Sequence, residues 1–321
     1  MPILPSLKVL LVKPDHLGDF AVTLPVLWEL AGRFGRENVA VMAGRANAEW
    51  AALLRWLPPI TPVDHPRYVR RAGTGRPWAG CRAAWGLRGR RFDYGVELTS
   101  SRHDIWGKTW LILAGARRRS GLADKFRLLV HEHHDLGQGH QTERMAQRFP
   151  TAWGITGTAR PEAFIPPALR WTPEARGLLL APFAGRPAKE GRPAFWIQLL
   201  QRLKGEGREI TLFAGPERAD DARHLLAASG LPTDGLFLPT SIRATLERLA
   251  RTGALLAPDT AIAHYAWLTG TPLVQLFADT DDPARWGSLG ASARLTAPAG
   301  MDGIGVEAVL AALREAERAR D

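Results

Sequence analysis

The sequence contains a single cysteine, Cys81, which excludes an internal disulfide and a thiolate metal cluster. It also lacks a long apolar segment near its N-terminus, where residues 9–12 (VLLV) are too few for a membrane span or the core of a signal peptide. We therefore expect a cytoplasmic protein in a reducing compartment.

Several motifs of common function classes are missing as well. The chain has no zinc-finger, ribonucleoprotein or helix-turn-helix signature, no short-period repeat and no low-complexity tract. It matches neither the Gly-x-x-x-x-Gly-Lys-Ser/Thr nor the Gly-x-Gly-x-x-Gly pattern. These absences argue against a P-loop NTPase, a classical dinucleotide enzyme and a nucleic-acid partner.

The chain has a formal net charge of +10, which is unevenly distributed. Its 321 residues exceed the usual size of one hydrophobic core, so we expect two domains, 1–168 and 169–321, divided at a proline-rich stretch. Residues 1–168 carry 24 Lys and Arg against 14 Asp and Glu, whereas residues 169–321 carry 18 of each. The first half should therefore meet an anionic partner, such as lipid headgroups or a phosphorylated glycan.

Both halves alternate between strand-like and helix-like segments, which predicts an α/β fold with two Rossmann-like, doubly wound domains. The predicted strands are 8–12, 38–42, 94–97, 178–181, 209–214, 254–257 and 273–277. The predicted helices are 20–34, 47–54, 104–113, 195–204, 219–228, 242–250, 261–268 and the amphipathic 306–318.

Ligands of open α/β sheets bind outside the carboxyl ends of the strands, so residues directly after strands are the best functional candidates. Asp19 follows the first strand and Gly18, and it can serve either as a helix cap or as a catalytic group. Lys189 lies in a loop of small residues before a helix, which suits a phosphate, although the spacing alone favours a solvated lysine.

Four further candidates follow strands of the second half. Glu217 can accept hydrogen bonds from ribose hydroxyls, or it can be a glutamate that favours a helix start. Asp259 and Thr260 open a helix that Thr260 would cap, and His264 lies about one turn farther along. A lone histidine is usually structural, but several polar residues after strands of one sheet favour a binding site.

Two charged stretches have simpler explanations. Residues 131–135 (HEHHD) crowd their side chains into five positions, which favours a solvated loop, and we expect no metal site. The arginine-rich stretch that includes Arg88, Arg90 and Arg91 can be a solubilising surface, and the interleaved Trp78 and Trp85 make a binding surface the alternative.

These segments together resemble glycosyltransferase family 9, whose best-known members are ADP-heptose:lipopolysaccharide heptosyltransferases. The resemblance spans nearly the whole chain through residues 8–24 (KVLLVKPDHLGDFAVTL), 180–189 (LAPFAGRPAK), 211–217 (TLFAGPE) and 257–280 (APDTAIAHYAWLTGTPLVQLFADT). The chain departs from the family around the donor, with Ala261 in place of a glycine, Ala278-Asp279 in place of Gly-Pro, and Phe183 after Pro182.

The resemblance implies a GT-B fold, with two domains facing across a cleft and the helix 306–318 packing back on the N-terminal domain. It also implies that Asp19 is the general base, that Lys189 and His264 hold the pyrophosphate, that Glu217 holds the ribose, and that Asp259 and Thr260 hold the sugar or its phosphate. Arg88, Arg90 and Arg91 are the expected acceptor contacts, on the strength of the basic first half.

The expected activity is inverting transfer of a sugar, heptose from ADP-heptose, to an anionic lipopolysaccharide-core acceptor, without a metal or other cofactor. The protein would work in the cytoplasm, peripherally at the inner face of the cytoplasmic membrane. A GT-B transferase with another nucleotide sugar, and a noncatalytic nucleotide- or polyanion-binding protein, are the two alternatives.

Overall fold

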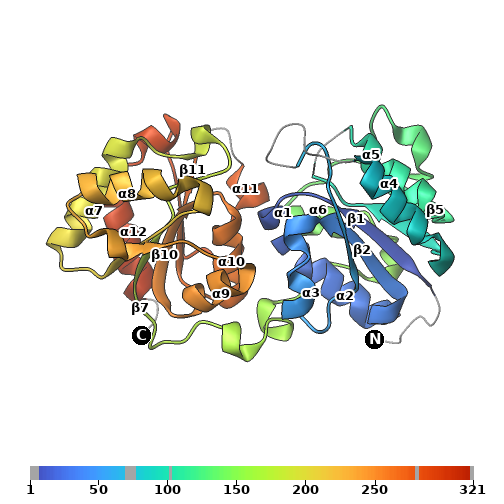
Figure 1. Cartoon of the computed structure of the whole chain (residues 1–321), viewed down its shortest axis with the longest axis horizontal. Coiled ribbons are helices and arrows are strands. Elements are labelled where there is room, and N and C mark those ends of the chain that lie inside the picture. The colour runs from blue at the N-terminus through green and yellow to red at the C-terminus, as the bar shows by residue number, and fades with distance from the viewer. Residues whose placement is uncertain (1–6, 69–76, 101–102, 279–281, 319–321) are drawn as a thin grey trace. The chain divides into compact units, whose positions relative to one another are not determined.

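The computed structural model describes residues 7–68, 77–100, 103–278 and 282–318. The chain folds as two compact units, Met1–Phe164 and Ile165–Asp321, and the predicted boundary after residue 168 lay close to this division (Figure 1). Each unit is a parallel sheet with helices, so the predicted α/β class with two doubly wound sheets is confirmed.

The first unit contains a six-stranded parallel sheet in the order β3-β2-β1-β4-β5-β6. Its strands are β1 (Val9–Lys13), β2 (Val39–Gly44), β3 (Ile60–Val63), β4 (Tyr94–Glu97), β5 (Arg118–Leu122) and β6 (Glu132–His134). Its helices are α1 (Leu17–Ala21), α2 (Leu24–Phe34), α3 (Trp50–Leu53), α4 (Pro77–Gly86), α5 (Ile105–Leu113) and α6 (Gln141–Ala146).

The centre of this sheet is buried on both faces, as a parallel sheet requires. Leu10 and Val12 point to one face, where they share a hydrophobic cluster with Ala84 of α4 and with Trp110 and Leu111 of α5. Helices α4 and α5 therefore cover one face of the sheet, and their opposite sides are turned outward.

Two predictions for the first unit were wrong in detail. The predicted helix 20–34 is two helices, because Pro25 lies in the first turn of α2, where its missing N–H costs no hydrogen bond, and α2 restarts after Thr23. The HEHHD run was expected to be a solvated loop, but Glu132–His134 forms the edge strand β6, which pairs with β5 through Ser120, Gly121 and Leu122.

The second unit contains a six-stranded parallel sheet in the order β12-β11-β10-β7-β8-β9. Its strands are β7 (Arg176–Leu180), β8 (Ile210–Phe213), β9 (Leu236–Phe237), β10 (Thr252–Pro258), β11 (Leu273–Phe277) and β12 (Ala293–Thr296). Its helices are α7 (Pro193–Gly205), α8 (Ala219–Ala228), α9 (Ile242–Ala250), α10 (Ala261–Thr269), α11 (Pro283–Trp286) and α12 (Val306–Arg318).

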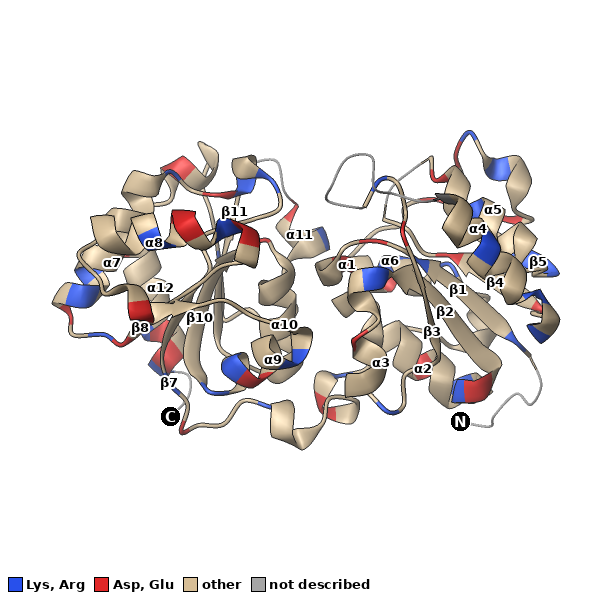
Figure 2. Ribbon diagram, viewed as in Figure 1, with Lys and Arg blue, Asp and Glu red and all other residues tan. Residues whose placement is uncertain are grey.

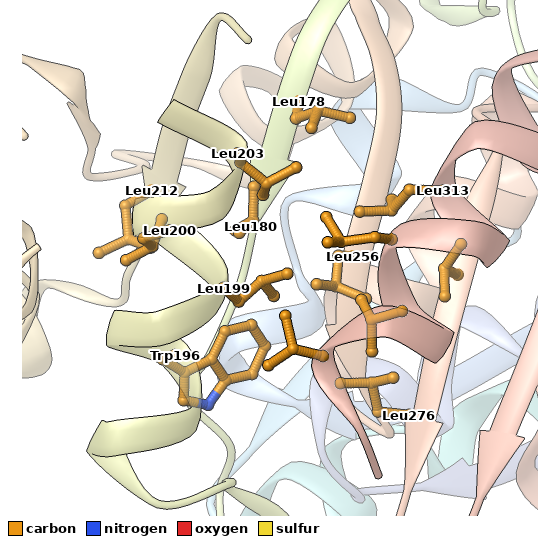
Figure 3. Close-up of a cluster of buried hydrophobic side chains, with 14 of the residues drawn as sticks. Leu178, Leu180, Trp196, Leu199, Leu200, Leu203, Leu212, Leu256, Leu276 and Leu313 are labelled. Carbon is orange, nitrogen blue, oxygen red and sulfur yellow. The ribbon is translucent and has the colours of Figure 1, made fainter. Parts of the chain in front are cut away.

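The core of the second unit lies between its sheet and the helices α7 and α12 (Figure 3). Leu199 and Leu203 of α7 and Leu313 of α12 pack against strand residues such as Leu256. Helix α12 was predicted to pack back on the N-terminal domain, but its apolar face belongs to the core of its own unit. The reason is that this face covers β10 and β11, which would otherwise expose leucines.

Candidate active site

Each sheet has a topological switch point. This is the place between two neighbouring strands where the strand order reverses, so that the loops after the two strands run to opposite faces of the sheet. In the first unit this point lies between β1 and β4, and in the second unit it lies between β7 and β10. Crevices at the carboxyl ends of such strand pairs are the usual ligand sites of open α/β sheets. The chain places its buried polar residues at both points.

Asp19 lies at the first switch point, in the short helix α1 that follows β1. The N-cap of this helix is His16, and Asp19 is its third residue, so the interpretation of Asp19 as the cap is wrong. Its carboxylate instead accepts a hydrogen bond of 2.9 Å from the hydroxyl of Ser100, which follows β4. The side chain is half-buried, which leaves part of it accessible.

Ser100 connects Asp19 to a buried ion pair. Its backbone N–H donates to Asp15 Oδ2 over 2.9 Å, and Lys13 Nζ donates to the same oxygen over 2.8 Å. Lys13 Nζ also lies 3.2 Å from Ser100 Oγ. The side chains of Lys13 and Asp15 are 0% and 1% exposed, so this pair is a fixed part of the sheet edge.

The surroundings shift the pKa values of Asp15 and Asp19 in opposite directions. Burial raises the pKa of Asp19, and the nearby charge of Asp15 adds to the increase, while Lys13 and the hydrogen bond from Ser100 oppose it. Burial also acts on Asp15, but the Lys13 ammonium and the Ser100 N–H lower the pKa of Asp15 overall. Asp15 therefore stays ionised, and Asp19 is the more basic carboxylate, as a general base should be.

Three predicted residues meet at the second switch point. The Lys189 ammonium, in the 3₁₀ turn Pro187–Lys189 after β7, forms an ion pair with the carboxylate of Asp259, which directly follows β10. His264 Nε2, from α10, lies 3.7 Å from the other oxygen of this carboxylate. The three side chains are 13%, 7% and 4% exposed, so Lys189 is not simply a solvated loop residue.

Thr260 occupies the N-cap position of α10, as predicted, but its hydroxyl donates to the carbonyl of Pro258 over 3.3 Å rather than accepting a capping bond. The hydroxyl therefore faces the end of β10, beside Asp259. Ala261 is the first residue of α10 and Ala278 follows β11 as a buried residue, whereas Asp279 lies outside the described residues.

Glu217 is exposed in the turn Pro216–Arg218 after β8, one strand away from β7. The loops of Lys189 and Glu217 are tied together by their neighbours, because Arg218 Nη1 donates to Glu190 Oε1 over 2.7 Å. The same Glu190 oxygen accepts from the Ala184 N–H over 2.8 Å. Glu217 thus shares the sheet edge of Lys189.

The predicted acceptor arginines lie elsewhere in the first unit. Arg88, Arg90 and Arg91 come directly before β4, at the amino edge of the sheet, whereas Asp19 follows β1 at the carboxyl edge. Arg90 donates to the carbonyl of Glu37 over 2.5 Å, and the Arg88 guanidinium lies 5.0 Å from the centre of the Trp85 ring. The fold does not bring these arginines together with Asp19, so their contact with an acceptor stays a prediction without geometric support.

Neither a metal centre nor a membrane span is found among the residues that the structure describes. Within these ranges, no group of three His, Cys, Asp or Glu side chains is arranged to hold a metal ion, and this includes the HEHHD strand. No helix of the described residues has the length and apolar character of a membrane span.

Sequence reasoning missed Lys13, Ser100 and Glu190. Ser100 follows β4 as Asp19 follows β1, so the rule that selected Asp19 could have selected it too. Lys13 gave a weaker signal, since a lysine at a strand end is commonly exposed, and only the structure shows it to be buried.

Comparisons with known proteins bear on the fold and the family. Similar structures include the E. coli heptosyltransferase WaaC with ADP-2-deoxy-2-fluoro heptose, at 17% identity and a TM-score of 0.74 over 96% of this chain and 99% of that one. A glycosyltransferase family 9 protein from Veillonella parvula matches at 14% identity and a TM-score of 0.80 over 99% of both chains. E. coli ADP-heptose lipopolysaccharide heptosyltransferase II matches at 19% identity and a TM-score of 0.74 over 98% and 99%.

These likenesses show the GT-B fold, and no curated protein sequence matches significantly. The family comparison is more specific, because glycosyltransferase family 9 (heptosyltransferase) matches residues 82–298, which is more than half of the chain. The protein is therefore a glycosyltransferase, and it belongs to family 9, the heptosyltransferase family.

Proposed function

We propose that this protein transfers heptose from ADP-heptose to a hydroxyl group of an anionic, lipopolysaccharide-core-type glycolipid, with inversion at the anomeric carbon. The observation that carries the proposal is Asp19, a half-buried carboxylate with a raised pKa at a switch point of a family 9 protein. The similar WaaC structure with ADP-2-deoxy-2-fluoro heptose supports this choice of donor.

In the proposed reaction Asp19 accepts the proton of the acceptor hydroxyl while the hydroxyl oxygen attacks the anomeric carbon. The bond from this carbon to the diphosphate oxygen breaks, and both of its electrons leave with the nucleotide diphosphate. Ser100 and the Lys13–Asp15 pair hold the Asp19 carboxylate in place. Because these groups are fixed by the fold, little reorganisation is needed as the charges develop.

The proposal assigns the donor nucleotide to residues 169–321. Lys189 and His264 would bind the pyrophosphate, and Asp259 and Thr260 the sugar or its phosphate. Asp259 holds Lys189 by its ion pair and lies near His264, so it positions both groups at the start of α10. The ammonium and the N-terminus of this helix favour negative charge, so they would stabilise the leaving diphosphate without a divalent ion.

The remaining assignments are Glu217 to the ribose and residues 1–168 to the acceptor. The excess of basic residues in 1–168 supports an anionic acceptor, and a glycolipid acceptor requires work at the inner surface of the cytoplasmic membrane.

Mass spectrometry of the products formed from a panel of nucleotide sugars and truncated lipopolysaccharide acceptors tests the proposal. Among the nucleotide sugars of the panel, we expect only ADP-heptose to give a product, and the mass of the acceptor should increase by one heptose. A product from another donor would favour the alternative of a GT-B transferase with different specificity. Tight ADP binding without transfer from any donor would favour the noncatalytic alternative.

A further inference from the structure

The outer side of α4 and α5 exposes large apolar side chains. Trp78 and Trp85 of α4 are 76% and 59% exposed, and Ile105 and Ile112 of α5 are 39% and 36% exposed. In both helices the pair is seven residues apart, so each pair stands on one face of its helix. The two helices pack against each other, and Gly80 of α4 leaves no room for a side chain beside Trp110 of α5. The two exposed stripes therefore belong to neighbouring helices on one side of the sheet.

A third apolar group extends this surface. Leu128, in the 3₁₀ turn Arg127–Leu129 after β5, is 90% exposed, and this turn contacts α5. Trp78 makes an edge contact with Trp106 of α5, at a ring distance of 6.0 Å. We call the set Trp78, Trp85, Ile105, Ile112 and Leu128 the α4–α5 surface.

The charged residues among these apolar groups are basic. Arg82 lies between the two tryptophans on the same face of α4, and Lys125 and Arg127 precede Leu128 in the chain. Helices α4 and α5 and the turn Arg127–Leu129 contain no acidic residue. Figure 2 shows the basic residues along α4 and near β5 in blue. A solubilising surface would carry mixed charges and few exposed tryptophans.

We propose that the α4–α5 surface docks the protein on a membrane that contains anionic phospholipid. Tryptophan favours the region between the acyl chains and the headgroups, where its ring is buried and its N–H stays near polar groups. Arginine and lysine beside it pair with lipid phosphates, and their aliphatic stems cover apolar surface. An apolar stripe beside the exposed Arg82, Lys125 and Arg127 therefore fits an anionic lipid surface.

The position of this surface suits delivery of a lipid-anchored acceptor. Helices α4 and α5 follow β3 and β4, so Trp78 and Ile105, near the starts of these helices, lie toward the carboxyl edge of the sheet, where Asp19 lies. The inference rests on the proposed function for the identity of the acceptor lipid, whereas docking itself requires no sugar transfer.

The test is co-flotation of the full chain with two kinds of vesicle, phosphatidylethanolamine with phosphatidylglycerol, and phosphatidylcholine alone. We expect binding to the anionic vesicles that weakens as salt is added. The Trp78→Ser/Trp85→Ser variant should lower the partition coefficient at least about tenfold, because full burial of one large apolar side chain corresponds to that factor or more. Arg82→Gln and Lys125→Gln should each lower it roughly fivefold.

The matched controls lie in the second unit. Leu289→Ser removes an apolar side chain that is 46% exposed, and Arg251→Gln removes an exposed charge, so both should bind vesicles as the wild type does. Leu128→Ser replaces the tryptophan variant as the test if that variant proves unfolded by circular dichroism.

Equal binding of the surface variants and the wild type would overturn the proposal, as would equal binding to both kinds of vesicle. A wild-type dimer that these variants convert to a monomer, without any vesicle binding, would identify a protein interface instead. Transfer to a delipidated, water-soluble acceptor is measured in parallel and should be unchanged in the variants. Vesicle binding without transfer by the wild type would reject the proposed function and leave the docking surface standing.

Discussion

Replacing Asp19 by asparagine separates the chemical role of this side chain from its structural role. Asparagine keeps an oxygen that can accept the hydrogen bond from Ser100 Oγ, and Asp19 is the third residue of α1 rather than its cap. The variant loses the favourable interaction of a carboxylate with the helix N-terminus, which is worth about 0.3–1 kcal/mol, so its free energy of unfolding should change by no more than about 1 kcal/mol. It can no longer accept a proton, and general-base assistance is worth about 10²–10⁴-fold. We therefore expect kcat to fall by about 10²–10⁴-fold.

The assay is single-turnover transfer at saturating donor and acceptor, with ADP affinity measured by calorimetry. Asp64→Asn is the matched control, because Asp64 follows β3 at the same sheet edge but pairs with the exposed Arg45. This control should keep its turnover, and both variants should bind ADP as the wild type does. A turnover of Asp19→Asn equal to that of the wild type, with chemistry rate-limiting, would refute the assignment of Asp19 as the base.

Three further predictions concern groups whose surroundings the structure defines. Lys189→Ala should weaken ADP binding about tenfold or more in calorimetry, since a charge-assisted contact is worth about 1.5–3 kcal/mol, whereas Lys204→Ala, on the exposed end of α7, should leave it unchanged. Ser100→Ala removes a hydrogen bond that lowers the pKa of Asp19, so the acid limb of the kcat/KM profile should move to higher pH; an unmoved limb would show that another group titrates there. Burial raises the pKa of Glu97 from 4.5 to about 7, against the opposing charge of Arg148, so the folded protein holds this proton more tightly than the unfolded chain. The free energy of unfolding of the wild type, relative to Glu97→Gln, should therefore fall between pH 4.5 and about 7, as denaturant titrations across this range can check.

The sequence predicted the bounds of several helices and strands whose apolar residues recur with a regular period. Strands β4 and β11 and helices α8, α9 and α12 have the bounds that the periodicity predicted. The strands that were missed, β3, β5, β6, β9 and β12, are short or polar: β9 has two residues, β5 begins with two arginines, and β6 reads Glu-His-His. Such strands lie at or near a sheet edge, where burial on both faces is not required, so an apolar run is not needed to form them.

For the candidate site, the sequence predicted the positions of single residues but not the contacts between them. The positions of Asp19, Lys189 and Asp259 after strands could be read from the sequence, because each strand before them is apolar. Their partners could not, since the Ser100–Asp19 bond requires β4 to lie beside β1, and the Lys189–Asp259 pair requires β10 to lie beside β7. Strand order is set by the packing of all the helices and loops, and local patterns do not encode it.

Charge counting could not place the arginines relative to Asp19, for a related reason. The excess of positive charge in residues 1–168 indicates an anionic partner, but a count over half of the chain does not distinguish the two edges of a sheet. Arg88, Arg90 and Arg91 precede a strand and therefore stand at its amino edge, whereas Lys13 ends a strand and stands at the carboxyl edge. One buried lysine thus lies at the sheet edge of Asp19, whereas the three arginines lie at the other edge.

The burial of Lys13 also bears on which carboxylate of the first unit we propose as the base. Asp15 and Asp19 both follow β1, but Asp15 is fully buried and receives the Lys13 ammonium and the Ser100 N–H on one oxygen. These contacts favour the ionised form of Asp15 so strongly that it is a poor proton acceptor. Its fixed negative charge then raises the pKa of Asp19, which burial has already raised. The ion pair therefore makes Asp19 the stronger base by keeping its neighbour charged.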